Sequence, residues 1–493
     1  MRAYISLLLC MGLVLSPLAV SSSHAQLAQG VTFLSLDEAL RLAWQNNLEI
    51  QIAQLDLSIK ETDLPSALAR YDTDLDIEAD FEQDEAEKSS VVVGTKTDTT
   101  RLNFALKRLL RFGTTLAMSF LNQRNATNST FTSVNPHFDT DVEVSLTQPL
   151  LKNWAGIVDR SEVEMTRVDI EQFDLDTQDR IEEILAACEE AYWELVREHE
   201  RVEIKTRALQ DAQRFLNINR ERIQTGLIEK PDLLAAEANV KQREIEVLIA
   251  ENSFQSASNE LRLKLNWAGQ ERILPTESPA FEKEVAYLDQ SLVTALSARR
   301  DYQKAKLEID EKEVQLTMKR NERWPQLDLE ATLTGNGLDR HWEDAVGESY
   351  AGDNPTYFVG VSASFPLERS EENAEHARAK FEKARAILEF QQTELKIVTE
   401  VESRVRDVNL AAVQADKRLA IESLQKEKLA EEEKKFSYGR SDSDTIIRFQ
   451  RDVLDASEAD LDAAIDHKKA LIELSRAQNT LLKKYEKRLD ASR

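Results

Sequence analysis

The segment FDTDVEVSLTQPLL, residues 138–151, alternates between two kinds of side chain. One parity is mostly apolar and consists of Phe138, Thr140, Val142, Val144 and Leu146. The other parity is polar and consists of Asp139, Asp141, Glu143, Ser145 and Thr147. A period of two is typical of a strand with one face in an apolar environment. We therefore predict a strand that ends near Gln148-Pro149, with an acidic face that needs an explanation.

Other segments show the same alternation. Their apolar positions are Leu75, Ile77, Ala79 and Phe81; Leu327, Leu329, Ala331 and Leu333; and Tyr357, Val359, Val361, Ala363 and Phe365. A further hairpin over residues 101–122 combines TRLNFALKR with TTLAMSFLN. Each run has roughly the ten residues of a tilted strand that crosses a membrane.

A half-buried sheet of a soluble protein would also alternate. Three features favour a membrane barrel. The strands interrupt helical arms, and the loops at one end of the strands, 84–99, 123–137 and 335–355, are long and polar. At the other end of the strands, Pro149 and Pro366 lead directly into helices. We predict that apolar residues face lipid and that carboxylates line the lumen, which would then prefer cations. The predicted lumen residues are Asp74, Asp76, Glu78, Asp80, Asp139, Asp141, Glu143, Asp328 and Glu330.

Long helices make up most of the remaining chain. Apolar residues recur at spacings of three and four over about 158–224, again after Gly226, and again after Gly439. This is the pattern of a coiled-coil seam. A helix over 158–224 would be roughly 100 Å long at 1.5 Å per residue, so we predict projecting antiparallel hairpins rather than a compact globule.

The chain also repeats itself. SLDEALRLAWQNN from Ser35 parallels SLVTALSARRDYQ from Ser291, and the turn at Gly226 parallels the turn at Gly439. We predict a first repeat over 26–278 and a second over 279–493. The first would hold barrel strands at about 74–150 and long helices at about 158–265; the second would hold strands at about 326–366 and long helices at about 371–485.

Residues 1–25 have the features of an export signal. Arg2 precedes the apolar run ISLLLCMGLVL, and Ser23-His24-Ala25 forms a small-x-small cleavage site. The alternative is a membrane-anchoring helix, which Pro17 and the cleavage site disfavour. No other run approaches 18 apolar residues, so an exported product would be periplasmic, secreted or an outer-membrane barrel. The one cysteine after the signal, Cys188, lies on an apolar helical stripe and is predicted to be a small core residue.

Composition disfavours other functional classes. The 493 residues carry a formal net charge of −26 and a pI near 4.8, which argues against a nucleic-acid partner. The six histidines form neither an HExxH motif nor a zinc-ligand spacing. We therefore predict no enzyme activity, no cofactor and no metal site.

Several motifs together resemble the TolC-like family of outer-membrane efflux proteins. They are SLDEALRLAWQNN, VSLTQPLL, TGLIEKPDLLAAEANV, VGVSASFPLE and YGRSDSDTIIRFQRDVLDASEADLDAA, in that order. The resemblance implies a mainly α-helical protein with a transmembrane β-barrel. It implies a homotrimer in which coiled-coil hairpins form an α-barrel tunnel continuous with a shared barrel in the outer membrane of a Gram-negative bacterium. Such a duct would passively release substrates delivered by an inner-membrane pump and a periplasmic adaptor, in efflux or type I secretion.

The resemblance also implies functions for the helical tips. The candidate adaptor contacts are Thr225, Gly226, Leu227, Tyr438, Gly439 and Arg440. The family's entrance can carry acidic residues six and nine positions after the second tip glycine, but this chain has Thr445 and Arg448 there. We include Asp232, Asp442 and Asp444 among the candidate entrance residues.

Two alternatives stay open at this stage. Simple family members have two strands per repeat and a twelve-stranded trimer, whereas the 101–122 hairpin would give eighteen strands if it joins the barrel. The chain could also be a periplasmic coiled-coil adaptor or scaffold without a channel, although that class does not explain duplicated strand pairs with outward apolar faces.

Overall fold

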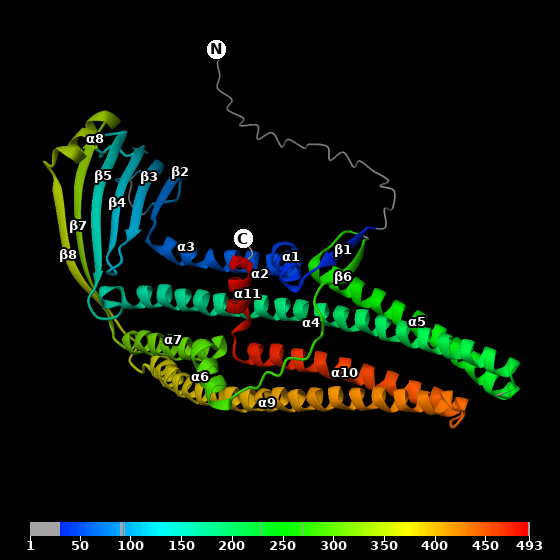
Figure 1. Cartoon of the computed structure of the whole chain (residues 1–493). Helices are drawn as coiled ribbons and strands as arrows, with labels where there is room; N and C mark the ends of the chain where they lie inside the picture. The colour runs from blue at the N-terminus through cyan, green and yellow to red at the C-terminus, as the bar shows by residue number, and fades with distance from the viewer. Residues whose placement is uncertain (1–29, 89–91, 93, 227, 270, 492–493) are drawn as a thin grey trace, which may run out of the picture.

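The computed structural model describes residues 30–88, 92, 94–226, 228–269 and 271–491. The predicted signal segment, residues 1–25, and the tip residue Leu227 lie outside this described part. A β-sheet stands at one end of an elongated molecule; two helices of 68 residues run from it to the other end, and each is paired over its far half with a shorter helix (Figure 1). Shorter helices and the C-terminus lie beside the middle of the long helices.

The sheet contains six antiparallel strands in the order β2-β3-β4-β5-β7-β8. Their bounds are β2 (Thr73–Asp84), β3 (Thr97–Leu109), β4 (Thr115–Thr127), β5 (His137–Pro149), β7 (Gln326–Asp339) and β8 (Pro355–Ser364). The hairpin predicted over 101–122 is β3 and β4, and it is inserted between β2 and β5. One chain therefore contributes six strands to this sheet rather than four.

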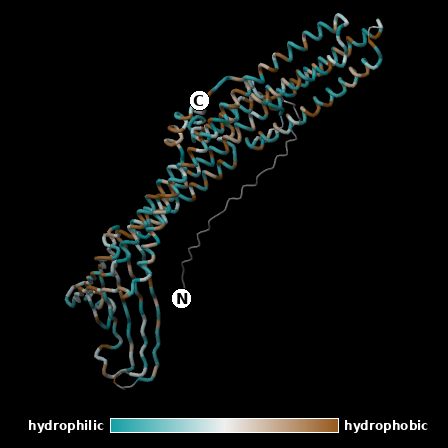
Figure 2. Tube along the Cα trace, turned by 90° about the horizontal axis from the view of Figure 1, so that it is seen from below, coloured by the Kyte–Doolittle hydropathy of each residue, from teal (hydrophilic) through white to brown (hydrophobic). Residues whose placement is uncertain are grey.

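The long helices form two antiparallel hairpins. The first is α4 (Ile157–Gln224) with α5 (Lys230–Leu265), and the second is α9 (Ser370–Ser437) with α10 (Ser443–Ala477). α4 and α10 are the inner pair, so the order across the molecule is α5-α4-α10-α9 (Figure 1). Apolar and polar residues alternate along all four helices (Figure 2). No helix of the described residues is both long enough and apolar enough to cross a membrane.

Each half of the chain has a bent helical segment before its strands. In the first half α1 (Leu36–Asn46) and α2 (Leu48–Glu61) meet at Asn47, and α3 (Asp63–Leu68) follows. In the second half α6 (Leu288–Ala298) and α7 (Arg300–Glu322) meet at Arg299. The backbone angles at the two bends are nearly equal, with φ −63° and ψ 123° at Asn47 and φ −64° and ψ 124° at Arg299. The sequence repeat is therefore visible in the backbone.

A short parallel pair was not predicted from the sequence. β1 (Val31–Leu34) pairs with β6 (Arg272–Pro275), which joins the start of the described chain to the connection between the two halves. Strands of four residues are too short to show a convincing alternation.

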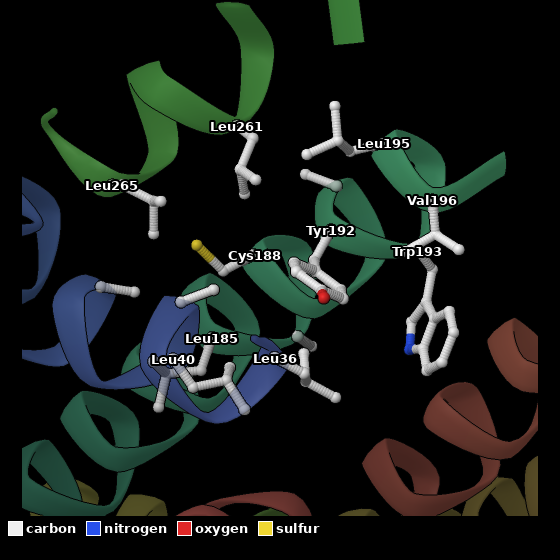
Figure 3. Packing of buried hydrophobic residues seen from close by; sticks show 14 of the residues in the cluster. Leu36, Leu40, Leu185, Cys188, Tyr192, Trp193, Leu195, Val196, Leu261 and Leu265 are labelled. Atoms are coloured by element: carbon white, nitrogen blue, oxygen red, sulfur yellow. The ribbon is translucent and has the colours of Figure 1, made fainter. Parts of the chain in front are cut away.

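The central core lies where α1, α4 and α5 meet (Figure 3). Its labelled members are Leu36, Leu40, Leu185, Cys188, Tyr192, Trp193, Leu195, Val196, Leu261 and Leu265. The Tyr192 hydroxyl donates a hydrogen bond of 3.0 Å to the Leu34 carbonyl and so ties α4 to β1. Cys188 is 1% exposed, and burial raises the pKa of its thiol to about 12. The prediction that Cys188 is a core residue is confirmed.

Both predicted transitions from strand directly into helix were wrong. Pro149 ends β5, and the chain turns through left-handed Asn153 and Ala155 before α4 begins. Pro366 likewise precedes Arg369, which is left-handed and caps α9. Proline therefore ends each ladder, but a separate turn is needed to redirect the chain.

The other differences concern elements predicted as continuous or as loops. The last helix does not run to 485, because α10 ends at Ala477, Asn479 is left-handed, and α11 (Leu481–Ala491) follows. The 123–137 loop is shorter than predicted, because β4 extends to Thr127. The 335–355 segment contains the end of β7 and a helix, α8 (Trp342–Ala351), rather than loop alone.

Candidate functional site

The strand register places all nine predicted lumen carboxylates on one face of the sheet. Residues paired across antiparallel strands share a face. Asp80 pairs with Arg101, Arg101 with Gln123, Gln123 with Asp139, and Asp139 with Leu338. Every second residue along each strand extends the same face, which we name the polar face. The lumen candidates on it are Asp74, Asp76, Glu78, Asp80, Asp139, Asp141, Glu143, Asp328 and Glu330.

The opposite face, which we name the apolar face, carries an exposed hydrophobic band across all six strands. Val359 and Val361 are 75% and 62% exposed, which is unusual for valine in a sheet. The large exposed residues of this face are Leu75, Ile77, Phe81, Leu102, Phe104, Leu106, Leu116, Met118, Val144, Leu146, Leu333, Tyr357, Val359 and Val361. Three large hydrophobic residues, Leu121, Leu338 and Phe358, are exposed on the polar face instead. A band of this size marks a surface that contacts lipid or protein.

Two residues of β3, the basic Arg101 and the neutral Asn103, donate to carboxylates on the polar face. Arg101 donates to Asp80 and to Glu82, each at 2.9 Å. Asn103 donates to Glu78 at 3.0 Å. The acids were predicted from the sequence but these partners were not, because Arg101 and Asn103 belong to a strand whose pairing was not known. The carboxylates of β5 have no basic residue directly opposite them in the register.

Aromatic side chains lie beyond both ends of the strands. Near the long helices, Phe112, Trp154, Trp324 and Phe365 are between 50% and 56% exposed. At the far end, the exposed aromatic residues are Phe131, Trp342 and Tyr350, and Tyr357 near the start of β8 adds to them. Two aromatic belts that flank an apolar band are typical of membrane-spanning sheets, because amphipathic rings favour the membrane–water interface. These belts were not predicted, although the sequence has an aromatic residue within about five positions of most strand ends.

Helix α8 packs on the far end of the apolar face. It contacts β7 and β5, and it lies so close that a Cβ at Gly337 would overlap the Ala345 carbonyl oxygen. Thr140, on the same face of β5, is fully buried and donates to Asn122 at 2.9 Å. The two glycines of the Gly335-Asn336-Gly337 segment therefore serve close packing of a helix.

Gly337→Ala should destabilise the sheet end by about 1–3 kcal/mol, because the added methyl group has no space. Gly347→Ala is the matched control, because Gly347 lies within α8 and a Cβ added there would meet no atom within 4 Å. Alanine there should stabilise the helix by about 0.5–1 kcal/mol. Thermal unfolding of both variants measures the difference. Equal midpoints would contradict the close packing.

The two helical tips lie side by side at the other end of the molecule. Arg222 of the first hairpin donates to the Phe436 carbonyl at 2.9 Å and to the Ser437 carbonyl at 3.3 Å. Its guanidinium also lies 4.2 Å from the centre of the Phe436 ring. A small core of Ala212, Phe215, Leu216, Ala236, Val240, Phe436 and Ile446 holds the tips together.

The predicted adaptor contacts that the structure describes, residues 225, 226 and 438–440, are exposed at these tips. Gly226 and Gly439 have φ values of 71° and 70°, which favour glycine, and both face open space. Tyr438 is 78% exposed, and Thr225 and Arg440 are also exposed. These residues are therefore accessible and are not needed for the small core beneath them.

The candidate entrance residues include two helix caps. Asp442 accepts hydrogen bonds from the backbone amide of Thr445 at 2.7 Å and from its hydroxyl at 3.1 Å, and these bonds lower the pKa of Asp442. Asp232 accepts from the backbone amide of Glu229 at 3.1 Å. Both carboxylates satisfy amides at a helix N-terminus. Asp444 and Arg448 are exposed.

A buried ion-pair network joins the two halves, and it was not predicted from the sequence. The Arg300 guanidinium lies 2.6 Å from Glu182 and 2.7 Å from Asp179, both on α4. Glu182 is 1% exposed. Asn479, in the turn after α10, accepts from the Arg300 amide at 3.2 Å and donates to Asp179 at 3.0 Å. We name Asp179, Glu182, Arg300 and Asn479 the junction network. It holds α7, α4 and the α10–α11 turn together.

One group of side chains has the spacing of metal ligands within the described part of the chain. Asp339, His341 and Asp344 have ligand atoms within 4.8 Å of one another. They stand at the exposed start of α8, where Asp339 accepts the His341 amide at 2.9 Å. The hydrogen bond from the His341 amide to Asp339 explains why these exposed side chains lie together at this turn, and we assign no metal site to them.

Comparisons with known proteins agree with this architecture. The sequence model of the outer membrane efflux protein family matches residues 108–266. A comparison with curated protein sequences finds no match. A crystal structure of CusC aligns with a TM-score of 0.67 and 12% identity, over 90% of this chain and 91% of that chain. The CusC structures were reported in a study of the conformational changes that accompany folding and transmembrane channel formation.

Other solved structures have the same fold. The outer membrane protein VceC of Vibrio cholerae aligns with a TM-score of 0.64 and 14% identity over 90% of this chain and 96% of that chain. The outer membrane channel CmeC of Campylobacter jejuni aligns with a TM-score of 0.62 and 15% identity, over 93% and 90% of the two chains. Identities this low show a shared fold alone. The family match and the shared fold confirm that this chain resembles the TolC-like outer-membrane efflux proteins.

Proposed function

We propose that the chain is the outer-membrane channel of a tripartite efflux or type I secretion system in a Gram-negative bacterium. The observation that carries this proposal is the two-faced sheet, with an exposed apolar band on one face and nine carboxylates on the other. In a membrane, the apolar face would contact lipid and the polar face would contact water. The aromatic residues at both strand ends would lie at the two membrane interfaces.

The open edges of the sheet favour an oligomer, and the resemblance to the TolC-like family implies three copies. Among the described strands, β2 pairs only with β3, and β8 pairs only with β7. A sheet in a membrane must close, because unpaired backbone groups are costly in hydrocarbon. Known barrels have at least eight strands, so six strands need further copies to close. Three copies would give a barrel of eighteen strands.

The edges of the helical layer support the same assembly. α5 and α9 are the outer helices, and both carry exposed apolar residues. On α9 these include Phe381, Leu388 and Leu395, which are spaced by seven residues and are 76%, 64% and 69% exposed. On α5, Leu248 and Leu263 are 65% and 79% exposed. A heptad spacing is typical of a coiled-coil seam. We propose that this sheet-side half of α9 packs against α2 of the next copy, and that the tip half of α9 packs against α5 of the next copy (Figure 1). On α2, Leu48, Ile52, Leu55 and Ile59 are 55%, 56%, 62% and 65% exposed.

In this assembly the duct would be passive. The chain would contribute the barrel, the helical tunnel and the entrance, and the energy for transport would come from the inner-membrane pump. The repeats 26–278 and 279–493 would each supply strands and one helical hairpin to the ring. Asp232, Asp442, Asp444, Thr445 and Arg448 would lie near the tunnel entrance, two of them as helix caps.

A photo-crosslinking amino acid in place of Tyr438 should capture a periplasmic adaptor in living cells, because Tyr438 is 78% exposed at the tip. The same amino acid in place of Leu424, further up α9 and 64% exposed, is the control and should not capture it. Mass spectrometry identifies the product. Capture from Leu424 alone would contradict the tip as the docking site.

Membrane fractionation tests the proposed function against the alternative of a soluble periplasmic scaffold. The channel should remain in the outer-membrane fraction, require detergent for extraction, and migrate as a trimer that heating dissociates. Release of a soluble monomer by osmotic shock would contradict the proposal and favour the scaffold.

A further inference from the structure

A cleft of about 520 Å³ separates the two helical hairpins between the central core and the tips. It is lined by α4, α5, α9, α10 and the connection between the two halves of the chain. Its volume lies within the range of small-molecule sites, about 300–1,000 Å³. The cleft is formed by one chain, so its lining does not depend on the trimer.

The cleft has an apolar wall. Phe281, from the connection between the halves, lines it together with Leu429, Val453 and Leu454. Phe281 also packs edge-on against the buried His467 ring, with the ring centres 5.3 Å apart. The His467 Nε2 atom lies 3.2 Å from the Glu284 carbonyl. These contacts hold the connection over the cleft and fix the position of the Phe281 side chain in its lining.

Most charges around the cleft already have partners. Lys426 lies 2.7 Å from Glu422, and Glu422 also accepts from Ser457 at 2.6 Å. Arg243 lies 2.7 Å from Glu246 and is 5% exposed. Arg207 also lines the cleft and donates to the Glu203 carbonyl at 3.2 Å. The lining therefore has three basic residues, Arg207, Arg243 and Lys426, against four carboxylates, Glu200, Asp211, Glu422 and Asp460, and its net charge does not repel a cation.

Two acceptor groups of the cleft lack such a partner among the described residues. The Gln450 side-chain oxygen is buried and accepts no hydrogen bond. Asp460 lies further along α10 and also lines the cleft; burial and the nearby Glu422 raise the pKa of its carboxyl, and Lys426 opposes them. A buried acceptor without a donor is costly, so a ligand that supplies N–H groups would be stabilised here.

We propose that this cleft binds an amphiphilic organic cation that carries amino groups. Asp460 and Gln450 are ten residues apart on α10, a rise of about 15 Å. One amino group would therefore donate to Asp460 and a second to Gln450, and the apolar or aromatic body between them would lie against Phe281, Leu429 and Leu454. Because the lining comes from both hairpins, a bound cation would stabilise their present spacing.

Proflavine, a planar fluorescent cation with two amino groups, is a suitable probe for the full chain purified in a non-ionic detergent. Fluorescence anisotropy should show saturable binding, and Asp460→Asn should weaken it at least tenfold. Asp455→Asn is the matched control, because Asp455 is exposed on the same helix, and it should change the affinity less than twofold. Phe281→Ala should weaken binding about fivefold. Circular dichroism and thermal unfolding establish that each variant is folded.

Three outcomes would overturn the site: unchanged affinity in Asp460→Asn, an equal loss in Asp455→Asn, or equal binding of the anionic dye fluorescein. A failure of the proposed channel is distinguishable from a failure of this inference. A chain that binds proflavine with the expected variant pattern but does not conduct ions would contradict the channel and leave the cleft site intact.

Discussion

Val144→Arg should prevent assembly in the outer membrane, whereas Ser145→Arg should be tolerated. The two residues are neighbours on β5 but belong to opposite faces: Val144 pairs with Met118 and Leu333 on the apolar face, and Ser145 pairs with Ala117 and Thr332 on the polar face. An arginine that faces lipid near the middle of a membrane costs about 2–4 kcal/mol in a barrel. A trimer would carry this cost three times.

The two variants form a closely matched pair. Both introduce the same residue into the same strand, one position apart, so general effects on expression or export are shared. Outer-membrane fractionation and the yield of heat-sensitive trimer measure assembly. Equal assembly of the two variants, or a greater loss with Ser145→Arg, would show that the apolar face does not contact lipid.

Arg300→Met should lower the free energy of unfolding by about 3–5 kcal/mol, because it removes one partner of a buried ion pair and leaves the others uncompensated. Glu182 is 1% exposed and would keep only its bond from the Leu481 amide, at 3.2 Å. Asp179 would keep the bond from Asn479. Arg476→Met is the control: Arg476 and Glu183 form an exposed ion pair at 3.4 Å, worth at most about 1 kcal/mol.

The loss in Arg300→Met should depend on pH. Burial raises the pKa of the Glu182 and Asp179 carboxyls, although Arg300 lowers both. A folded-state pKa above the unfolded value means that these carboxyls favour the fold most below their ordinary pKa and less as pH rises through the raised value. The positive charge of Arg300 opposes this effect of burial, so the pKa values of Glu182 and Asp179 should rise further when Arg300 is removed.

The destabilisation by Arg300→Met should therefore be largest at neutral pH and smaller near pH 5. Thermal unfolding of the wild type and of both single variants at the two pH values measures this. The double variant Arg300→Met, Glu182→Gln should recover part of the stability at neutral pH, because the buried charge is gone. The account would be contradicted if Arg300→Met lost as little stability as Arg476→Met, or if its loss of stability grew as pH falls.

The sequence predicted the features that local periodicity encodes. The alternation over 138–147 was sufficient to assign each β5 side chain to one of two faces, because a strand has a period of two. The three-and-four spacing around Gly226 and Gly439 was sufficient to locate the long hairpins and their tips. Both kinds of pattern need only a few neighbouring residues.

Features that depend on distant partners could not be predicted in this way. Arg300 and Glu182 are 118 positions apart, and neither belongs to a recognisable motif. The effect of Arg101 on Asp80 and Glu82 required the register of β2 and β3. Helix α8 is short and contains Gly347, and its position depends on the space that Gly335 and Gly337 provide. Long-range packing decides each of these.

The entrance candidates illustrate a second limit. An acidic residue near a tip can be part of an entrance, but it can equally cap a helix. Asp442 accepts from the amide and hydroxyl of Thr445, so its place in the sequence has a structural reason. Sequence position alone does not separate these roles.

Ion selectivity in a planar lipid bilayer tests the central claim, a water-filled duct lined by the polar face, most directly. The purified full chain, recorded at neutral pH in a potassium chloride gradient, should give discrete conductance steps with a reversal potential that favours K⁺ over Cl⁻. Glu143→Lys should shift the reversal potential toward Cl⁻, because the register places Glu143 on the polar face. Anion preference of the wild type, or the absence of conductance, would contradict the account.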